Sequence, residues 1–397
     1  MELLSMKDLD LNNKIVIIRE DLNVPIKNGK VTNTNRIDSA LITIKLALSK
    51  GAKVAIISHL GRPEEGEYNP EYSLAPIADI LKEKLNIPVQ FVQNWLEGFD
   101  INAGELFLLE NIRFCVGEKS NADELSKKIA SLADVYVMDA FATAHRQHAS
   151  TYGALKYAKQ DGKEVCAGPL FLAEINALQK GLANPKKPIV AIVGGSKIST
   201  KIDILTKLIT KVDQLIVGGG IANTFIAASG LNIGNSLYEE SYLGTARKLL
   251  KDAQDKGSII PMPVDVVVAK EISDDAKTCI KSVNNVENGD LILDIGPDTA
   301  KMLCKYISKA NTIIWNGPLG VFEHASFAEG TKKIANAIAN SSAYSLAGGG
   351  DTIAAIDKFN IADKISYIST GGGAFLDFIQ SDTFAVLELL AKKDKNF

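Results

Sequence analysis

The sequence has few cysteines and no long apolar run, and these absences exclude several classes of protein. Only 4 of its 397 residues are cysteine. They are scattered without a CxxC pair, so we expect neither a zinc ligand set nor a disulfide framework but buried or half-buried free thiols. No uninterrupted apolar stretch reaches the ~18 residues that a membrane-spanning helix needs. The first eleven residues contain no apolar signal segment. These features predict a cytoplasmic location and no membrane partner.

Strong net charge and the common nucleotide-binding motifs are also missing. Basic residues number 44 and acidic residues 47, a net charge of −3. This balance predicts no nucleic-acid partner and requires any anion site to be local. No G-x-x-x-x-G-K-[ST] segment occurs, which excludes a P-loop protein, and no G-x-G-x-x-G segment occurs, which disfavours a Rossmann cofactor. The paired H-R-D and D-F-G motifs of protein kinases are absent as well.

Short apolar runs alternate with helical patterns through almost the whole chain. A clear helix has Ile37, Leu41, Ile44 and Leu48 at spacings of three and four, and Gly51 ends it. The predicted strands cover residues 15–18, 54–57, 88–91, 106–109, 135–138, 189–193, 214–217, 264–268, 312–315, 344–346 and 366–368. This alternation predicts an α/β fold with two doubly wound, Rossmann-like parallel-sheet lobes joined by a helix and a hinge.

Prolines suggest where the two lobes separate. Pro169 precedes an apparent helix, Leu170 to Leu182, and Pro185 and Pro188 follow it. A helix between prolines suits a semi-rigid connector. We therefore predict an N-terminal domain over 1–168, a connector over 169–187 and a C-terminal domain over 188–374.

Arginine is rare, and its distribution is uneven. Five of the six arginines lie in the first 146 residues, at or just after predicted strands or at the start of the first helix: Arg19, Arg36, Arg62, Arg113 and Arg146. Guanidinium groups bind phosphate and carboxylate bidentately, and ligands of open α/β sheets collect at the carboxyl ends of strands. We expect these arginines to form an anion site, although any one of them could instead pair with an acid. Arg247, on a lysine-rich helix, is expected to be solvated. Three histidines, His59, His145 and His148, are expected to hydrogen-bond at the anion site rather than to bind a metal.

The second half is rich in glycine clusters at strand ends. The clusters lie at residues 194–195, 218–220, 348–350 and 371–373, and Lys197 and Asp351 follow two of them. Glycine amides at helix N-termini form natural phosphate sites, and an aspartate beside them suits magnesium carried by a nucleotide. A single triglycine could be only a tight turn. In a further loop, Glu323 could accept a hydrogen bond from a ribose hydroxyl, whereas Trp315 is expected in the core.

The first half of the chain therefore suits the binding of a small polyanion, and the second half suits a nucleotide with magnesium. Two separate substrate sites of this kind are typical of a small-molecule kinase. Over essentially the whole chain, the sequence resembles the phosphoglycerate kinase family in its bacterial form. The matching blocks run in order over 19–25, 59–63, 109–114, 139–150, 191–201, 215–225, 315–323, 347–352 and 369–374. The resemblance implies reversible phosphoryl transfer between MgATP and 3-phosphoglycerate, giving MgADP and 1,3-bisphosphoglycerate, in glycolysis and gluconeogenesis. It also implies a monomer whose C-terminal segment, 375–397, returns to the N-terminal domain.

The resemblance assigns roles to individual residues. It implies that seven residues bind the phosphoglycerate: Asp21, Asn23, Arg36, His59, Arg62, Arg113 and Arg146. On the nucleotide it places Lys197, Lys201, Gly219, Asn316, Glu323, Gly349, Gly350, Asp351 and Thr352, with Asp351 facing the magnesium. Our hypothesis for catalysis assigns charge stabilisation to Arg36, Lys197, the amides of Gly350 and Gly373, and magnesium, gated by domain closure.

Three residues depart from the family pattern without removing a charge that the chemistry needs. Glu20 replaces a usual aliphatic residue, Ala142 a usual glycine and Phe375 a usual serine. Two alternatives remain at this stage. One is a kinase for another carboxylic acid, and the other is a non-catalytic nucleotide-binding protein on a kinase fold.

Overall fold

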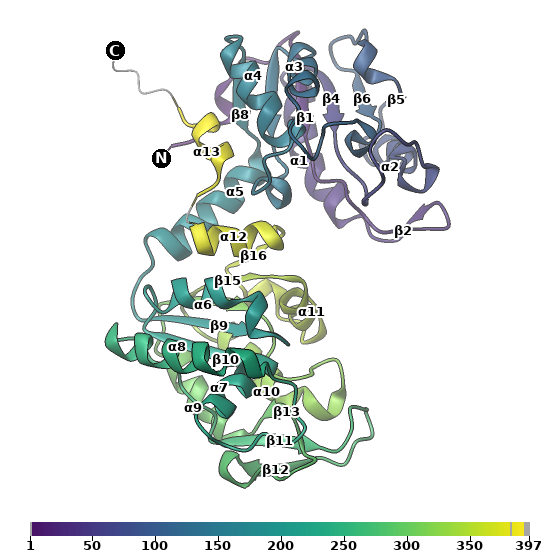
Figure 1. The fold of residues 1–397 in the computed structure, drawn as a ribbon. Coiled ribbons are helices and arrows are strands. Elements are labelled where there is room, and N and C mark those ends of the chain that lie inside the picture. Colours follow the sequence, from purple (N-terminus) through teal and green to yellow (C-terminus); the bar gives the residue numbers. More distant parts are fainter. Residues whose placement is uncertain (1, 382, 393–397) are drawn as a thin grey trace. The chain divides into compact units, whose positions relative to one another are not determined.

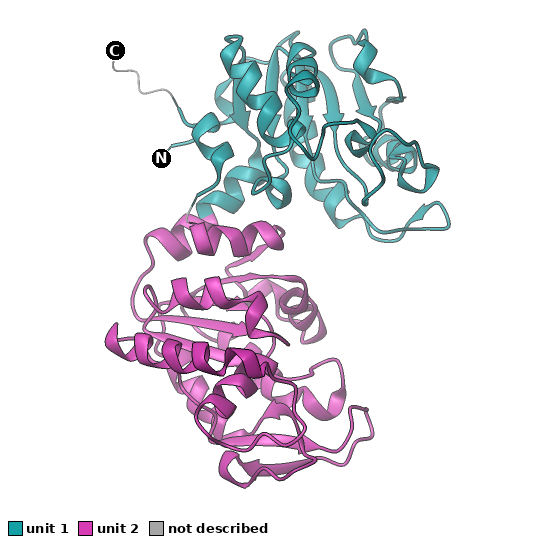
Figure 2. Ribbon diagram, viewed as in Figure 1, with its two compact units in different colours: residues 1–176, 383–397 teal, residues 177–382 magenta. Residues whose placement is uncertain are grey.

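The computed structural model describes residues 2–381 and 383–392, which form two compact units (Figure 2). Unit 1 is Met1–Asn176 with Thr383–Phe397, and unit 2 is Ala177–Asp382. The division after Asn176 falls inside the predicted connector, 169–187. The return to unit 1 was predicted from residue 375 but begins at 383, because residues 373–381 form a helix that packs on α6 (Ile202–Leu208) within unit 2. Residues 382 and 393–397 of the predicted segment lie outside the described residues.

Unit 1 is built on a six-stranded parallel sheet with the order β5-β6-β4-β1-β7-β8 (Figure 1). The strands are β1 (Ile15–Arg19), β4 (Lys53–Ile57), β5 (Val89–Val92), β6 (Leu106–Leu109), β7 (Val135–Met138) and β8 (Glu164–Ala167). A short hairpin, β2 (Ile26–Lys27) and β3 (Lys30–Val31), precedes the first helix. Five of the six strands match predictions from apolar runs, and β8 was not predicted.

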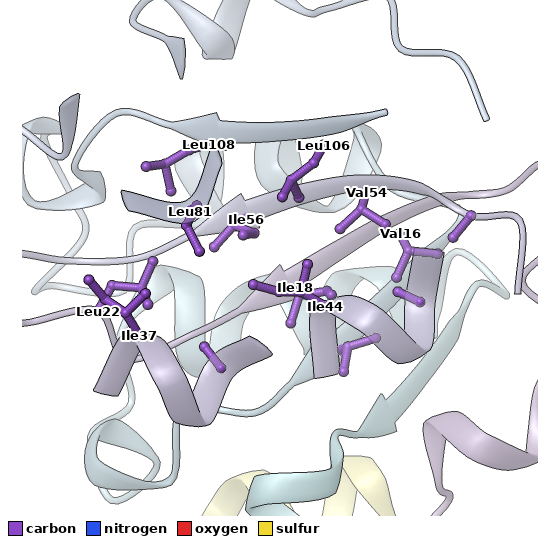
Figure 3. Close-up of a cluster of buried hydrophobic side chains, with 14 of the residues drawn as sticks. Val16, Ile18, Leu22, Ile37, Ile44, Val54, Ile56, Leu81, Leu106 and Leu108 are labelled. Atoms are coloured by element: carbon purple, nitrogen blue, oxygen red, sulfur yellow. The ribbon is translucent and has the colours of Figure 1, made fainter. Parts of the chain in front are cut away.

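Helices cover both faces of this sheet. They are α1 (Asn35–Ser49), α2 (Ala75–Leu85), α3 (Asp123–Ser131), α4 (Ala154–Gln160), α5 (Pro169–Leu178), which crosses the division between the units, and α13 (Ala385–Leu390). Val16 and Ile18 of β1 pack with Ile44 of α1 and Leu81 of α2 in the core (Figure 3). Alternate strand residues point to the opposite face, where the Tyr136 hydroxyl donates to a carbonyl near the start of α4 (2.7 Å). The sheet is therefore doubly wound.

Unit 2 contains a five-stranded parallel sheet with the order β10-β9-β14-β15-β16. Its strands are β9 (Ile189–Gly194), β10 (Gln214–Gly218), β14 (Thr312–Asn316), β15 (Tyr344–Gly348) and β16 (Tyr367–Ser369). The helices are α6 (Ile202–Leu208), α7 (Gly219–Ala228), α8 (Leu243–Asp255), α9 (Pro297–Ile307), α10 (Glu329–Ala339), α11 (Gly350–Lys358) and α12 (Gly373–Ser381). Trp315 is buried in the core, as predicted.

Some predictions for unit 2 were wrong. The run 264–268 was expected in a parallel sheet, but β11 (Asp265–Ala269) is the centre of a separate antiparallel sheet with β12 (Cys279–Ser282) and β13 (Leu291–Ile295). Cys279 on the edge strand β12 is exposed, not buried or half-buried. The connector helix is α5 followed by a π-helical turn, η7 (Gln179–Ala183).

No helix in the described ranges, 2–381 and 383–392, is long and apolar enough to cross a membrane.

Candidate functional site

The predicted anion residues of unit 1 follow adjacent strands at one edge of the sheet. Strands β6, β4, β1 and β7 are neighbours and parallel, so their carboxyl ends meet. Arg113 lies in a 3-10 turn, η4 (Ile112–Phe114), after β6, and His59 and Arg62 follow β4. Asp21 follows β1, and Arg146 follows β7. The topology therefore brings these five residues to the side of the sheet where the strands have their carboxyl ends. We call this side the anion edge.

Arg36, in the first turn of α1, is held by the loop after β1. Its Nη1 donates to Asp21 Oδ1 (3.0 Å) and to the carbonyl oxygen of Asn23 (2.9 Å). The Asn23 side-chain oxygen accepts from the Gly61 N–H (2.9 Å), in the loop after β4. About 40% of the Arg36 side chain remains exposed, so its guanidinium is oriented by protein and still open to a ligand.

Arg19 lies beneath this edge and is completely buried. Its Nε donates to Ser150 Oγ (2.9 Å), and its Nη2 lies 3.4 Å from His59 Nδ1. The Ser150 N–H and hydroxyl both donate to the buried Glu118 carboxylate (2.9 and 2.7 Å). Burial raises the pKa of Glu118, and Arg19 opposes that shift. This buried network lies beneath the anion edge and contacts it through His59. The rarity of arginine drew attention to Arg19, but no sequence signal showed that it lies underneath.

His59 and His148 are held neutral beside the arginines. Burial lowers the pKa of His59 well below its usual range, and the charges of Arg19, Arg113, Arg36 and Arg146 lower it further. Burial, followed by neighbouring cations, lowers the pKa of His148 to about 4. The positive charges of four arginines therefore act on the single imidazole of His59. Neutral imidazoles fit the expected hydrogen-bonding role.

The remaining arginines differ in exposure. Arg113 is buried, and its Nη2 lies 3.4 Å from His148 Nδ1. Its Nε is buried without a hydrogen-bond partner in the described part of the chain. Arg146 donates from Nε to His145 Nε2 (3.0 Å), and Arg62 is exposed. A buried guanidinium N–H without a protein partner suits an anionic ligand.

Unit 2 contains a pocket of about 460 Å³ at the carboxyl ends of its parallel strands. Gly219, Glu323 and Asp351, all predicted for the nucleotide, line it. Gly219 adopts φ +65°, and a Cβ there would lie 2.8 Å from the Gly195 carbonyl oxygen. Only glycine suits this turn.

Lys201, Asn316 and Thr352 form a second group of predicted residues at the ends of β14 and β15. The Lys201 ammonium donates to Asn316 Oδ1, and the Asn316 amide donates to the Gly348 carbonyl (2.6 Å). The Gly317 N–H donates to Thr352 Oγ1 (2.7 Å). Burial lowers the pKa of Lys201, and the charge of Asp351 opposes the shift. A half-buried lysine is therefore fixed beside Asp351.

Other predicted residues lie nearby but outside the pocket lining. Lys197 is exposed in the loop after β9. Gly349, with φ +100°, caps α11, which begins at Gly350, and Gly373 begins α12. Because β15 and β16 are adjacent, these two helix N-termini follow neighbouring strands. Helix N-termini favour anions.

The sequence interpretation missed the apolar wall of the pocket and one buried acid. Leu291 and Leu293 of β13 line the pocket, as does Asp294. Asp294 accepts from the N–H groups of Gly330 (2.7 Å) and Ile295 (2.9 Å), and its burial raises its pKa to about 7. The small antiparallel sheet supplies this wall, and that sheet was not predicted.

Comparison with known proteins gives a consistent result. The family model described as phosphoglycerate kinase matches residues 6–382. A phosphoglycerate kinase of Francisella philomiragia is 55% identical over 393 residues, covering 99% of both chains, and one of Francisella tularensis subsp. holarctica is equally similar. The solved phosphoglycerate kinase of Coxiella burnetii has a TM-score of 0.94 and 52% identity, covering 98% of this chain and 99% of that one. The Pyrococcus horikoshii OT3 enzyme has a TM-score of 0.80 and 31% identity, covering 98% of each chain.

Proposed function

Because the chain belongs to the phosphoglycerate kinase family, we propose that it transfers a phosphoryl group reversibly between MgATP and 3-phosphoglycerate. The products are MgADP and 1,3-bisphosphoglycerate. The observation that carries the proposal is the pairing of two dissimilar sites. Unit 1 has an arginine-rich strand edge with neutral imidazoles, and unit 2 has a glycine-lined pocket beside a lysine and an aspartate.

In this proposal the unit 1 edge binds the phosphoglycerate. Arg36 faces solvent while Asp21 and Asn23 orient it, so its charge is preorganised for an anion. Arg113 offers, from a buried position, an N–H that has no hydrogen-bond partner among residues 2–381 and 383–392. The neutral His59 can hydrogen-bond without adding a titrating charge.

The acceptor chemistry explains why no acid–base pair is needed. The acceptor carboxyl group is ionised at neutral pH, so no base has to remove a proton from it. Catalysis then depends on in-line positioning and on neutralising charge at the transferring phosphoryl group. We assign that neutralisation to Arg36, Lys197 and the amides of Gly350 and Gly373.

The nucleotide is assigned to the pocket of unit 2. The apolar wall from β13 suits a base, the turn at Gly219 allows a close backbone approach, and Glu323 can accept from a ribose hydroxyl. Asp351 supplies a carboxylate at the pocket, which suits a magnesium ion that also binds nucleotide phosphates. When bound, that ion would reduce the negative charge of the phosphates. Lys201, held by Asn316, adds a fixed cation.

The two assigned sites belong to different units, so transfer requires closure of the units around both substrates. Closure would also exclude water, which competes with the acceptor for the phosphoryl group. The segments in which we expect the motion are 167–188 and 369–373. We further propose that the protein acts as a cytoplasmic monomer in glycolysis and gluconeogenesis.

The test is to measure 3-phosphoglycerate and MgADP binding separately by calorimetry. Arg36→Ala should weaken 3-phosphoglycerate binding at least about tenfold, which corresponds to loss of a charge-assisted hydrogen bond, while MgADP binding stays intact. Asp351→Asn should weaken MgADP binding and leave 3-phosphoglycerate binding unchanged.

Matched controls come from the same chain. Arg247→Ala removes an exposed arginine that lies outside both sites, and Asp357→Asn removes an exposed acid from the same helix as Asp351. Both controls should bind both ligands normally. If Arg36→Ala bound 3-phosphoglycerate as tightly as Arg247→Ala, the assignment of the acceptor to unit 1 would be wrong.

A further inference from the structure

Two acidic side chains, Glu20 and Asp139, are buried together beneath the anion edge of unit 1. Glu20 directly follows β1 and Asp139 directly follows β7, which are neighbouring parallel strands. Their exposed fractions are 1% and 2%. Because Arg19 pairs with Met138 in the register of β1 and β7, the two carboxyl groups that follow lie side by side, within hydrogen-bonding reach of each other. Because an ionised carboxylate has no donor, a hydrogen bond between them requires one shared proton.

The partners of each carboxyl group show which of them holds the proton. Asp139 accepts from the Thr43 hydroxyl of α1 and from the Phe171 N–H of α5 (2.9 Å), and these donors stabilise its anion. Glu20 Oε1 has no hydrogen-bond partner in the described part of the chain, which suits the carbonyl oxygen of a neutral acid. Glu20 is therefore the donor and Asp139 the acceptor.

Most of the influences on Glu20 favour its protonated form. Burial raises the pKa of Glu20 well above its usual range, and Asp139 and Asp21 raise it further, while Arg19 opposes them. Burial raises the pKa of Asp139 to about 6, although its donors from α1 and α5 lower it. The groups that α1 and α5 direct at the pair, a hydroxyl and backbone N–H groups, are uncharged.

The pair connects three segments that matter for acceptor binding. Glu20 begins the loop that carries Asp21 and Asn23, and its carbonyl oxygen accepts from the Ser58 hydroxyl (2.8 Å). Asp139 begins the loop that leads to Arg146, and it also binds the first turn of α5. The start of α5 fits closely here, since a Cβ at Gly168 would lie 2.3 Å from the Asp139 carboxyl group.

We propose that Glu20 and Asp139 are a positioning pair that shares a single proton. This proton holds the loops after β1 and β7, together with the start of α5, in the arrangement that binds 3-phosphoglycerate. This inference rests on the proposed function. When Glu20 loses its proton to solvent at alkaline pH, two buried carboxylates face each other and repel. The loops then separate, and acceptor binding weakens while the nucleotide site is unaffected.

The experiment compares wild type, Glu20→Gln and Glu20→Leu from about pH 6 to about pH 10, a range that lies above the ordinary carboxyl pKa. The glutamine amide donates to Asp139 at every pH, whereas leucine never donates. Glu105→Gln, an exposed acid of the same unit, is the control. The measured quantities are the 3-phosphoglycerate dissociation constant and the KM and kcat of turnover.

We expect wild type and Glu20→Gln to bind equally well at the acidic end and to differ by about tenfold or more at the alkaline end, the effect of one pKa unit of coupling. The difference should appear in KM rather than kcat, and Glu105→Gln should follow wild type. Glu20→Leu should bind more weakly than Glu20→Gln at every pH. Parallel profiles for wild type and Glu20→Gln, or equal affinities for the leucine and glutamine variants, would overturn the proposal.

A carboxyl ¹³C spectrum of glutamate-labelled protein separates this inference from the proposed function. A protonated glutamate signal at neutral pH that disappears in Glu20→Gln is expected even if the chain binds no 3-phosphoglycerate. Absence of that signal would overturn the shared proton directly. Presence of the signal without 3-phosphoglycerate binding would overturn the positioning role together with the proposed function.

Discussion

Phe375 offers the sharpest test of how packing supports the glycine loops of unit 2. The ring is completely buried in the first turn of α12. It lies against Gly348, where an added Cβ would come within 2.6 Å of the ring. Truncation to alanine should therefore leave a cavity directly behind the triglycine turn. Such losses of buried phenylalanine cost about 3–5 kcal/mol of unfolding free energy.

The assay can report unit 2 alone, because the chain has two tryptophans and each unit buries one. In a Trp95→Phe background, urea unfolding followed by fluorescence reports only Trp315 of unit 2. With a slope of about 2 kcal/mol per molar urea, Phe375→Ala should lower the midpoint by about 2 M. Ile280→Ala, which truncates an exposed side chain of the same unit, should change stability by less than about 0.5 kcal/mol. A loss below about 1 kcal/mol for Phe375→Ala would refute the reasoning.

Four further results are expected. Gly219→Ala, which forces a Cβ toward the Gly195 carbonyl at positive φ, should weaken MgADP binding at least about tenfold in calorimetry and leave 3-phosphoglycerate binding intact. Arg19→Met should destabilise unit 1 by about 3–5 kcal/mol in urea unfolding, because it removes a buried cation that offsets the charge of the buried Glu118; a loss near zero would contradict this. The Asp294 carboxyl group has a pKa of about 7 in the folded protein, so it binds its proton more tightly in the folded state than in the unfolded state. Stability of unit 2 should therefore fall as pH rises from about 4 to about 7, by up to about 4 kcal/mol, and Asp294→Asn should flatten that slope. Small-angle scattering should show compaction only when both substrates are bound, and an unchanged profile would argue against closure.

The sequence predicts the parallel sheets well because apolar runs and strand-end loops are local signals. β6 and β7 match their predicted bounds, and the arginines after them reach the same edge because parallel strands end together. Strand β12 was missed because it is exposed and irregular in pattern, so it lacks an apolar run. Strand β13 does contain an apolar run, Leu291 to Leu293, but it was not among the predicted strands, and the pocket wall that it builds was missed with it.

Burial depth is the main property that local patterns do not provide. Glu118 and Ser150 are 32 residues apart, and their hydrogen bonds form only after the fold closes. Glu20 was noticed as a departure in residue type, but its bond to Asp139 depends on the pairing of β1 with β7. Ala142, the third departure, lies in a short 3-10 turn, η5 (Phe141–Thr143), without a positive φ, so the turn does not need glycine.

The most direct test of the central claim is turnover with 3-phosphoglycerate and MgATP, coupled through glyceraldehyde-3-phosphate dehydrogenase to NADH oxidation. The account predicts activity that requires 3-phosphoglycerate, ATP and magnesium together, and that falls at least about a thousandfold in Arg36→Ala. A folded protein that binds MgADP but gives no 3-phosphoglycerate-dependent NADH oxidation would contradict it.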